Sequence, residues 1–166
     1  MLKNIRKMKR EEIPECVCVI REAFKTVAEE FGFTAENAPR FTAFATTEER
    51  LQWHFEQEHR PMYVYCIGEK IVGYYSLALL NDGAVELNNL AVVPAYRHQG
   101  IGGQLLQHAF AETHNLGCNR LKISIVEENN VLRRWYEIHG FVHMGIKKFD
   151  FFPFTCGYLE RDLTNR

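Results

Sequence analysis

The segment at residues 85–103, VELNNLAVVPAYRHQGIGG, constrains the fold of this chain more than any other part of it. Its first half is rich in Val and Leu, which is typical of a buried strand, and its second half carries glycines that lead into a helical pattern. The first amide N–H groups of a helix have no intrahelical partner, and the helix dipole adds roughly half a positive charge there. The segment therefore predicts an anion-binding turn between a strand and a helix, suited to a phosphate group.

Two familiar phosphate-binding patterns do not fit the spacing of these glycines. A dinucleotide-binding fingerprint requires a third glycine where Leu105 stands. A P-loop requires Gly-Lys-Ser or Gly-Lys-Thr where residues 103–105 read Gly-Gln-Leu. The pattern present is Arg-x-x-Gly-x-Gly at residues 97–102, in which the glycines let the backbone approach a ligand closely.

This pattern is followed by a second motif, Asn-x-x-Leu-x-x-x-Tyr-Glu-x-x-Gly-Phe, at residues 129–141. In this order and at this separation, the two motifs resemble the GNAT superfamily of acyl-CoA-dependent N-acetyltransferases, and the close match covers about residues 84–145. The resemblance implies a GNAT fold of the α/β (α+β) class. In that fold a mixed central sheet of about six or seven strands has helices on both faces.

The resemblance also implies which residues bind acetyl-CoA, the expected cosubstrate. Arg97 would pair with the pyrophosphate or lie in solvent, and His98 fits a solvated loop better than a catalytic base. Asn129 would contact the pantetheine arm, cap the following helix or do both, with Asn130 as the alternative. The candidate cofactor-binding residues are Leu90, Ala91, Val92, Arg97, His98, Gln99, Gly100, Ile101, Gly102, Gly103 and Asn129.

Acyl transfer from a thioester to an amine requires a proton acceptor for the amine and a proton donor for the departing thiolate. Glu86 matches the position of the general-base glutamate in histone-acetylating members of the superfamily, and its apolar neighbours predict burial on both faces of the strand. The alternative is a carboxylate that faces solvent or a neighbouring cation. Tyr136 matches the general-acid tyrosine of many relatives, with packing in the core as the alternative.

The order of elements follows from hydrophobic periodicity and turn residues. Helices are expected at residues 11–31, 46 or 47 to 59, 100–115 and 130–139, and a loop at 33–44. Strands are expected at residues 5–8, 62–67, 71–80, 84–93, 120–126, 141–149 and 155–163.

Composition limits the class of protein. A chain of 166 residues and 19.4 kDa is expected to form one domain, residues 1–166. A formal net charge of −1 disfavours nucleic acid or a membrane as a partner, and the absence of an apolar signal segment favours the cytoplasm. The five cysteines are scattered without a Cys-x-x-Cys pair, so neither a disulfide framework nor a metal site is expected.

The acceptor is the least determined part of the function. Residues 11–58 contain eleven acidic residues and four Lys or Arg, which favours a cationic acceptor, although solvated helix faces explain the same pattern. The phenylalanines at 149, 151, 152 and 154 would line the acceptor pocket, form a homodimer contact or pack in the core. The resemblance implies that the chain moves the acetyl group of acetyl-CoA to a primary amine by direct attack in a ternary complex. Its acceptor would be a small cationic amine or a peptide amine, and a noncatalytic acyl-CoA-binding or regulatory module is the alternative.

Overall fold

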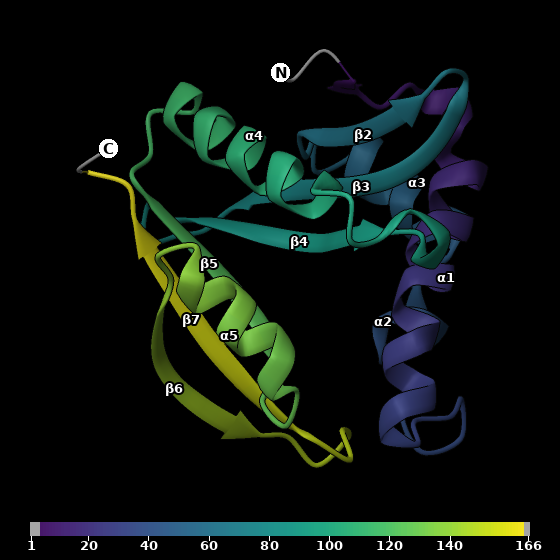
Figure 1. Ribbon diagram of the computed structural model, residues 1–166, viewed down its shortest axis with the longest axis vertical. Coiled ribbons are helices and arrows are strands. Elements are labelled where there is room, and N and C mark those ends of the chain that lie inside the picture. Colours follow the sequence, from purple (N-terminus) through teal and green to yellow (C-terminus); the bar gives the residue numbers. More distant parts are fainter. Residues whose placement is uncertain (1–3, 165–166) are drawn as a thin grey trace.

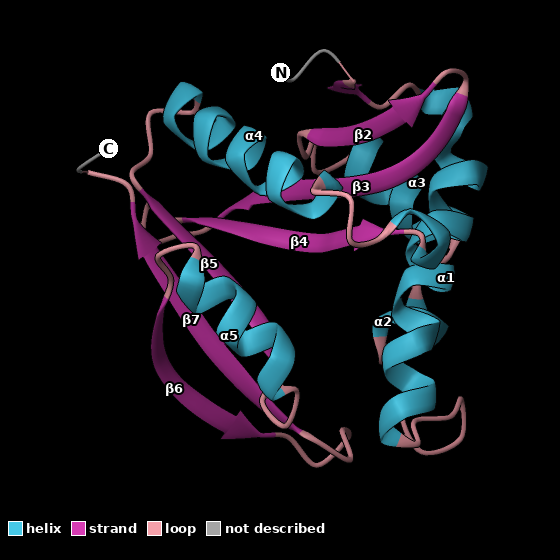
Figure 2. Cartoon of the chain, in the orientation of Figure 1, coloured by secondary structure: helices cyan, strands magenta, loops and turns pink. Residues whose placement is uncertain are grey.

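The computed structural model describes residues 4–164, in which a seven-stranded mixed sheet has the order β1-β2-β3-β4-β5-β7-β6 (Figures 1 and 2). The strands are β1 (Ile5–Lys7), β2 (Met62–Ile67), β3 (Lys70–Leu79), β4 (Val85–Val92), β5 (Arg120–Val126), β6 (Val142–Lys148) and β7 (Thr155–Asp162). The helices are α1 (Ile13–Phe31), α2 (Thr42–Ala45), α3 (Glu48–Glu56), α4 (Ile101–Asn115) and α5 (Asn130–Ile138), with short 3-10 turns η1 (Arg10–Glu12) and η2 (Pro94–Tyr96). The mixed sheet with helices on both faces confirms the predicted fold class.

The sheet opens in its middle, between the parallel strands β4 and β5. These strands pair only through Val85 with Leu121 and through Glu86 with Lys122, and then they diverge (Figure 1). On the other edge of β4, two residues, Asn89 and Leu90, lie opposite the single residue Tyr75 of β3, and this β-bulge bends the strand. The second half of β4 therefore has a strand partner on one edge only.

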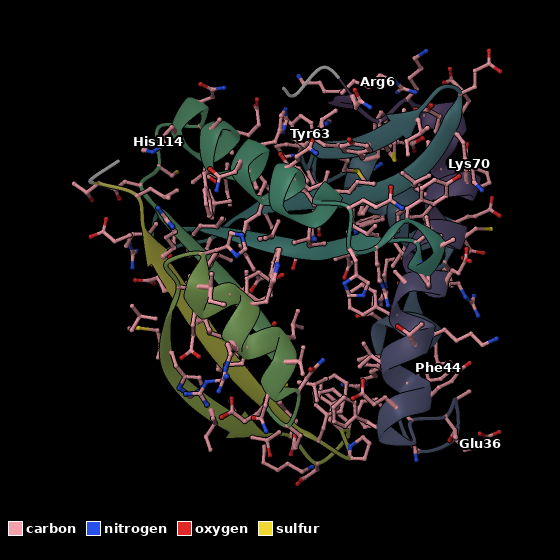
Figure 3. All side chains as sticks on the ribbon, viewed as in Figure 1. Arg6, Glu36, Phe44, Tyr63, Lys70 and His114 are labelled. Atoms are coloured by element: carbon pink, nitrogen blue, oxygen red, sulfur yellow. The ribbon has the colours of Figure 1, made fainter. Side chains whose placement is uncertain are left out.

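Two hydrophobic cores lie on the two faces of the sheet. On one face, α1 and α3 pack on β2 and β3 through residues such as Ile20, Leu51 and Val64. On the other face, α4 packs through Leu105 and Leu106, and a polar pair lies beneath it: Tyr63, which points from β2 toward α4 (Figure 3), donates to Glu112 Oε2 at 2.8 Å. The two layers of helices hold β4 between them.

A third core joins the C-terminal end of α1 to the start of β7. Phe154 is buried and contacts Phe33 and Phe41, with ring centroids 4.9 and 5.7 Å away. Phe152 stacks on Phe154, whereas Phe151 stays 40% exposed. Three roles were considered for this phenylalanine cluster: lining the acceptor pocket, forming a homodimer contact and packing in the core. For Phe154 the structure shows packing in the core.

The structure corrects two boundaries and adds one short turn. The segment 33–44, expected as a loop, contains the start of the short helix α2. Buried Phe41 and Ala43 pack in the third core and hold this helix in place. Helix α3 ends at Glu56, before the expected end, and His59 takes a left-handed conformation (φ 50°) that no helix continues through. The turn η2 between β4 and α4 was not expected from the sequence.

Within residues 4–164, no helix is both long and apolar enough to cross a membrane. The five cysteines are free thiols, of which Cys16 and Cys156 are buried. The same described range contains no cluster of His, Cys, Asp and Glu side chains with the spacing of metal ligands.

Candidate active site

The loop between η2 and α4 presents a row of backbone donors. The N–H groups of residues 98–103 make no hydrogen bond to the described part of the chain. His98 (φ 63°) and Gly100 (φ 82°) both take the left-handed conformation, and Gly100 is the residue that precedes the first turn of α4. Consecutive amides in such a turn, at the positive end of a helix dipole, form a concave binding site for an anion.

The burial of the side chains in and around this loop shows which groups of residues 98–103 can contact a ligand. Ile101 is buried in the core beside α4, so it offers a ligand only its amide. His98, Gln99 and Gly100 are exposed. A Cβ built on Gly102 would lie 3.5 Å from Trp135 Cζ2, so the indole of α5 forms one wall beside the loop. Trp135 was missed by sequence reasoning, because nothing in its local pattern marks it.

Arg97 differs from its expected role. Its guanidinium donates to Val92 O (3.1 Å), Thr26 Oγ1 (2.9 Å) and Ala23 O (2.8 Å), which ties η2 to α1 and to the end of β4. Burial lowers the pKa of this guanidinium, and its backbone N–H already bonds Pro94 O. The side chain therefore faces α1, and the expected pairing with a pyrophosphate does not fit this arrangement.

The second half of β4 supplies the candidate backbone contacts at 90–92. Ala91 is buried against the α1 side, while Leu90 and Val92 are half-buried and pack on the α4 side. Because β5 has already diverged, the edge of these residues toward β5 has no strand partner among the described residues. The bulge residue Asn89 (φ 55°) lies at the start of this free edge. The sequence does contain a signal for this bulge, the pair Asn88 and Asn89 within an apolar strand, because asparagine is uncommon in strands and tolerates the left-handed conformation.

Helix α5 borders the other side of the same opening. Asn129 precedes its first turn, and Asn129 Oδ1 accepts a hydrogen bond from the Leu132 N–H at 3.2 Å, so the capping function expected for this residue is present. A shallow groove of about 340 Å³ runs along the outer surface of the helix. It is lined by Asn130, Val131, Arg134, Trp135 and Ile138. Arg134, also missed by sequence reasoning, is an exposed cation in this groove.

Tyr136 points from α5 into the core. Its ring packs against Trp135 and Phe141, with centroids 4.9 and 5.2 Å away, and the residue is 6% exposed. Its hydroxyl has no hydrogen-bond partner among residues 4–164. Burial raises the pKa of this phenol, which keeps the hydroxyl protonated and able to donate.

Glu86 lies on the opposite side of β4 from Leu87. The prediction of burial on both faces was wrong, because Val85 and Leu87 are buried while Glu86 is half-buried. Asn88 bridges Glu86 to Arg60 in the amide orientation that satisfies both neighbours: Nδ2 donates to Glu86 Oε1 (2.9 Å) and Oδ1 accepts from Arg60 Nη1 (3.2 Å). Burial raises the pKa of the Glu86 carboxyl, and the charges of Arg60 and Lys122 oppose this rise.

A cavity of about 240 Å³ opens on this side of β4, between α2, α3 and the bulge. Its polar lining is rich in guanidinium groups and contains no Asp or Glu among the described residues. The lining residues are Arg40, Thr42, Thr46, Arg50, Leu51, His54, Arg60, Asn88 and Asn89. The acids that suggested a cationic acceptor are absent from this lining, so they give that expectation no support.

Comparison with known proteins identifies the family of this arrangement. Residues 22–141 match the family model described as the acetyltransferase (GNAT) family. An uncharacterised N-acetyltransferase of Mycobacterium bovis is 30% identical over 80 residues, which is 48% of this chain and 51% of that protein. An uncharacterised N-acetyltransferase from the lysA 3' region of Bacillus methanolicus is 27% identical over 60 residues, 36% and 50% of the two chains. The chain spans about half the length of the curated relatives it matches.

Solved structures with similar folds cover nearly the whole chain. The PaiA N-acetyltransferase from Thermoplasma acidophilum, in complex with coenzyme A, has a TM-score of 0.79 at 19% identity and covers 95% of this chain and 97% of its own. The ribosomal-protein-S18-alanine N-acetyltransferase from Escherichia coli has a TM-score of 0.72 at 17% identity, with 98% and 94% covered. At these identities the comparison establishes the fold.

Proposed function

The chain belongs to the acetyltransferase (GNAT) family, and from that premise we propose that it transfers the acetyl group of acetyl-CoA to a primary amine by direct attack in a ternary complex. The observation that carries the proposal is the row of N–H groups at residues 98–103 that have no hydrogen-bond partner within residues 4–164. This row follows the free edge of β4 along the chain. Several similar structures are described as complexes with CoA or acetyl-CoA.

In the proposed complex the amides of residues 98–103 hold the pyrophosphate of acetyl-CoA. The free edge of β4 at residues 90–92 runs along the pantetheine arm, and Asn129 lies beside it at the start of α5. Trp135 and Arg134 add an aromatic wall and a positive charge on the α5 side. Arg97 fixes the start of the loop through its hydrogen bonds to α1, and so acts as a positioning residue.

In this proposal the chemistry is carried by Glu86 and Tyr136. Glu86 takes a proton from the substrate ammonium, directly or through water, and the neutral amine nitrogen then attacks the thioester carbonyl carbon. The C–S bond breaks, CoA leaves as the thiolate, and the nitrogen gives its second proton to solvent as the amide forms. A lysine-like ammonium has a pKa of ~10.4, so a carboxylate with a raised pKa is a better acceptor than an exposed one. Tyr136 donates a hydrogen bond to the thiolate as it departs. A thiol is a stronger acid than this buried phenol. The hydrogen bond from Tyr136 therefore stabilises the thiolate before any full transfer of the phenol proton to it.

The competing candidate is a noncatalytic module that binds acyl-CoA. Such a module requires the amide loop but has no use for a carboxylate on the acceptor side of β4. It also has no use for the Tyr136 phenol on the other side, which has no hydrogen-bond partner within residues 4–164. The proposal also treats residues 1–166 as a single cytoplasmic domain that needs no metal. A homodimer stays a prediction.

A turnover experiment tests the proposal. Acetyl-CoA is incubated with the protein and a panel of primary amines, and the release of free thiol is measured together with the mass of the acetylated amine. We expect thiol release that depends on the amine, with initial-rate lines that intersect when both substrates are varied, as a ternary complex requires. Parallel lines would indicate an acetyl-enzyme, and thiol release with no acetylated product would reject amine acetylation.

A further inference from the structure

Positively charged side chains are concentrated in the cavity between α2, α3 and β4. Three arginines, Arg40, Arg50 and Arg60, line it. We propose that this cavity binds an acceptor that carries, besides its amine, an anionic oxyacid group, in the first instance a carboxylate. The inference rests on the proposed acetyl transfer and names the substrate class of the same site.

Two of the three guanidinium groups have no carboxylate partner within the described residues. Arg40 lies over the ring of Phe151, 4.2 Å from its centroid, and forms no ion pair in residues 4–164. Arg50 likewise forms none there: its backbone N–H donates to Thr47 Oγ1, and its guanidinium forms no hydrogen bond within residues 4–164. Each planar guanidinium therefore keeps its paired donors for a ligand, and this geometry matches a carboxylate or phosphate.

The third arginine is connected to the proposed base. Arg60 Nε pairs with Glu58 Oε1 at 2.6 Å, and its Nη1 reaches Asn88, which in turn bonds Glu86. Asn88 and Asn89 form the β4 wall of the cavity. The cavity thus has a cationic end at α2 and α3 and an Asn88 wall at β4, and Asn88 hydrogen-bonds Glu86, which lies outside the lining. This order of groups is expected for a molecule with an anion at one end and an amine at the other.

The other titratable groups near the cavity are consistent with a positive electrostatic potential inside it. His54 lines the cavity, and burial together with the charges of Arg60 and Arg50 lowers its pKa, so it stays neutral at pH 7. The nearest acidic groups are already engaged: Glu58 pairs with Arg60, and Glu86 with Asn88. A volume of about 240 Å³ is below the roughly 300–1,000 Å³ common for ligand pockets. The size therefore suits a small molecule.

The test uses sets of acceptors that differ only in charge. Each set contains an α-amino acid, its carboxamide, the alkylamine without the carboxylate, and the corresponding aminophosphonic acid, and polyamines are added as cationic acceptors. We expect kcat/KM for at least one amino acid to exceed that for its carboxamide by about 10-fold or more, because the carboxamide cannot form a charge-assisted hydrogen bond with a guanidinium. The phosphonic acids distinguish a carboxylate from a phosphate-type group.

Variants then locate the preference. Arg50→Gln and, separately, Arg40→Gln should reduce the carboxylate-to-carboxamide ratio by about 10-fold, mainly through KM for the acceptor, with KM for acetyl-CoA unchanged. Both side chains are exposed, so the variants should fold. Arg10→Gln is the matched control: it removes an exposed arginine that pairs with Glu56 and does not line the cavity, and it should keep the wild-type ratio.

The outcomes separate this inference from the proposed function. Acetylation of amines with no preference for an anionic group, or a ratio unchanged in both variants, overturns the inference and leaves acetyl transfer standing. If no amine is acetylated, the proposed function fails, and titration of the same amino acids into CoA-saturated protein decides the inference. If the amino acids bind and the Arg50→Gln variant binds them more weakly, the result supports an anion site. If they do not bind, the inference is rejected.

Discussion

At the scale of single residues, the two proposed reacting groups lie on opposite sides of the sheet. Tyr136 belongs to the core under α4 and α5, whereas Glu86 faces Asn88 and Arg60 on the α3 side. Burial raises the pKa of both, and each shift suits its role: the phenol stays a donor and the carboxylate becomes a stronger base.

For Tyr136→Phe we expect kcat to fall by about 10- to 1,000-fold with little change in KM for acetyl-CoA, because only the hydroxyl that serves the thiolate is lost. The ring contacts with Trp135 and Phe141 remain, so the melting temperature should stay near that of the wild type. Steady-state kinetics measure the effect. Tyr63→Phe, which removes a hydroxyl bonded to Glu112, is the control and should keep kcat. A kcat within about twofold of wild type in Tyr136→Phe would make this residue a core aromatic only.

Glu86 predicts a pH dependence. A base must be deprotonated, and the pKa of Glu86 is raised, so kcat/KM should decline as pH falls through a value above the ordinary 4.5 of a glutamate. Glu86→Gln should lose most activity where the acceptor amine is protonated, and part of the loss should return at high pH, where free amine is abundant. A profile from about pH 5 to 9.5 measures both effects. Wild-type rates throughout, in a variant that still binds CoA, would leave ordered water as the base.

At the scale of elements, the site is built from the ends and interruptions of regular structure. The bulge at Asn89 and the early separation of β5 leave part of β4 with a free edge, and the left-handed residues His98 and Gly100 turn the following amides outward. Sequence reasoning found the loop, because its glycines are visible in the motif. It misjudged Arg97, because a motif does not reveal that α1 packs close enough to take the guanidinium.

The loop predicts the effect of a side chain at Gly102. Its Cβ would fit beside Trp135 at 3.5 Å, so Gly102→Val should fold, but the added methyl groups should obstruct the approach of a phosphate to the amides. Losing one or two hydrogen bonds to a charged group should weaken CoA binding by roughly 10- to 100-fold. Calorimetric titration measures this change. Gly145→Val, on β6 with nothing near its Cβ, should bind CoA like the wild type, and equal affinity in the two variants would refute the loop as the phosphate site.

At the scale of the whole molecule, the fold was predictable and the acceptor side was not. The order of strands and helices follows from local periodicity and from glycines such as Gly32, which ends α1 in a left-handed conformation. The cationic cavity combines Arg40, Arg50 and Arg60, which belong to separate segments and share no sequence pattern. Counting acids along residues 11–58 pointed to a cationic acceptor, because composition does not tell which side chains face inward.

The most direct test of the account is the melting temperature of the protein with acetyl-CoA, compared with NAD and ATP at equal concentrations. All three ligands carry phosphate groups, but the spacing of the loop and the opening beside β4 favour only the CoA ester. At about 100 times its Kd, a ligand that binds only the folded state stabilises it by about 2.7 kcal/mol. We expect acetyl-CoA to raise the melting temperature by several degrees, and NAD and ATP to have much smaller effects. Equal stabilisation by NAD, or no shift with acetyl-CoA, would contradict the account.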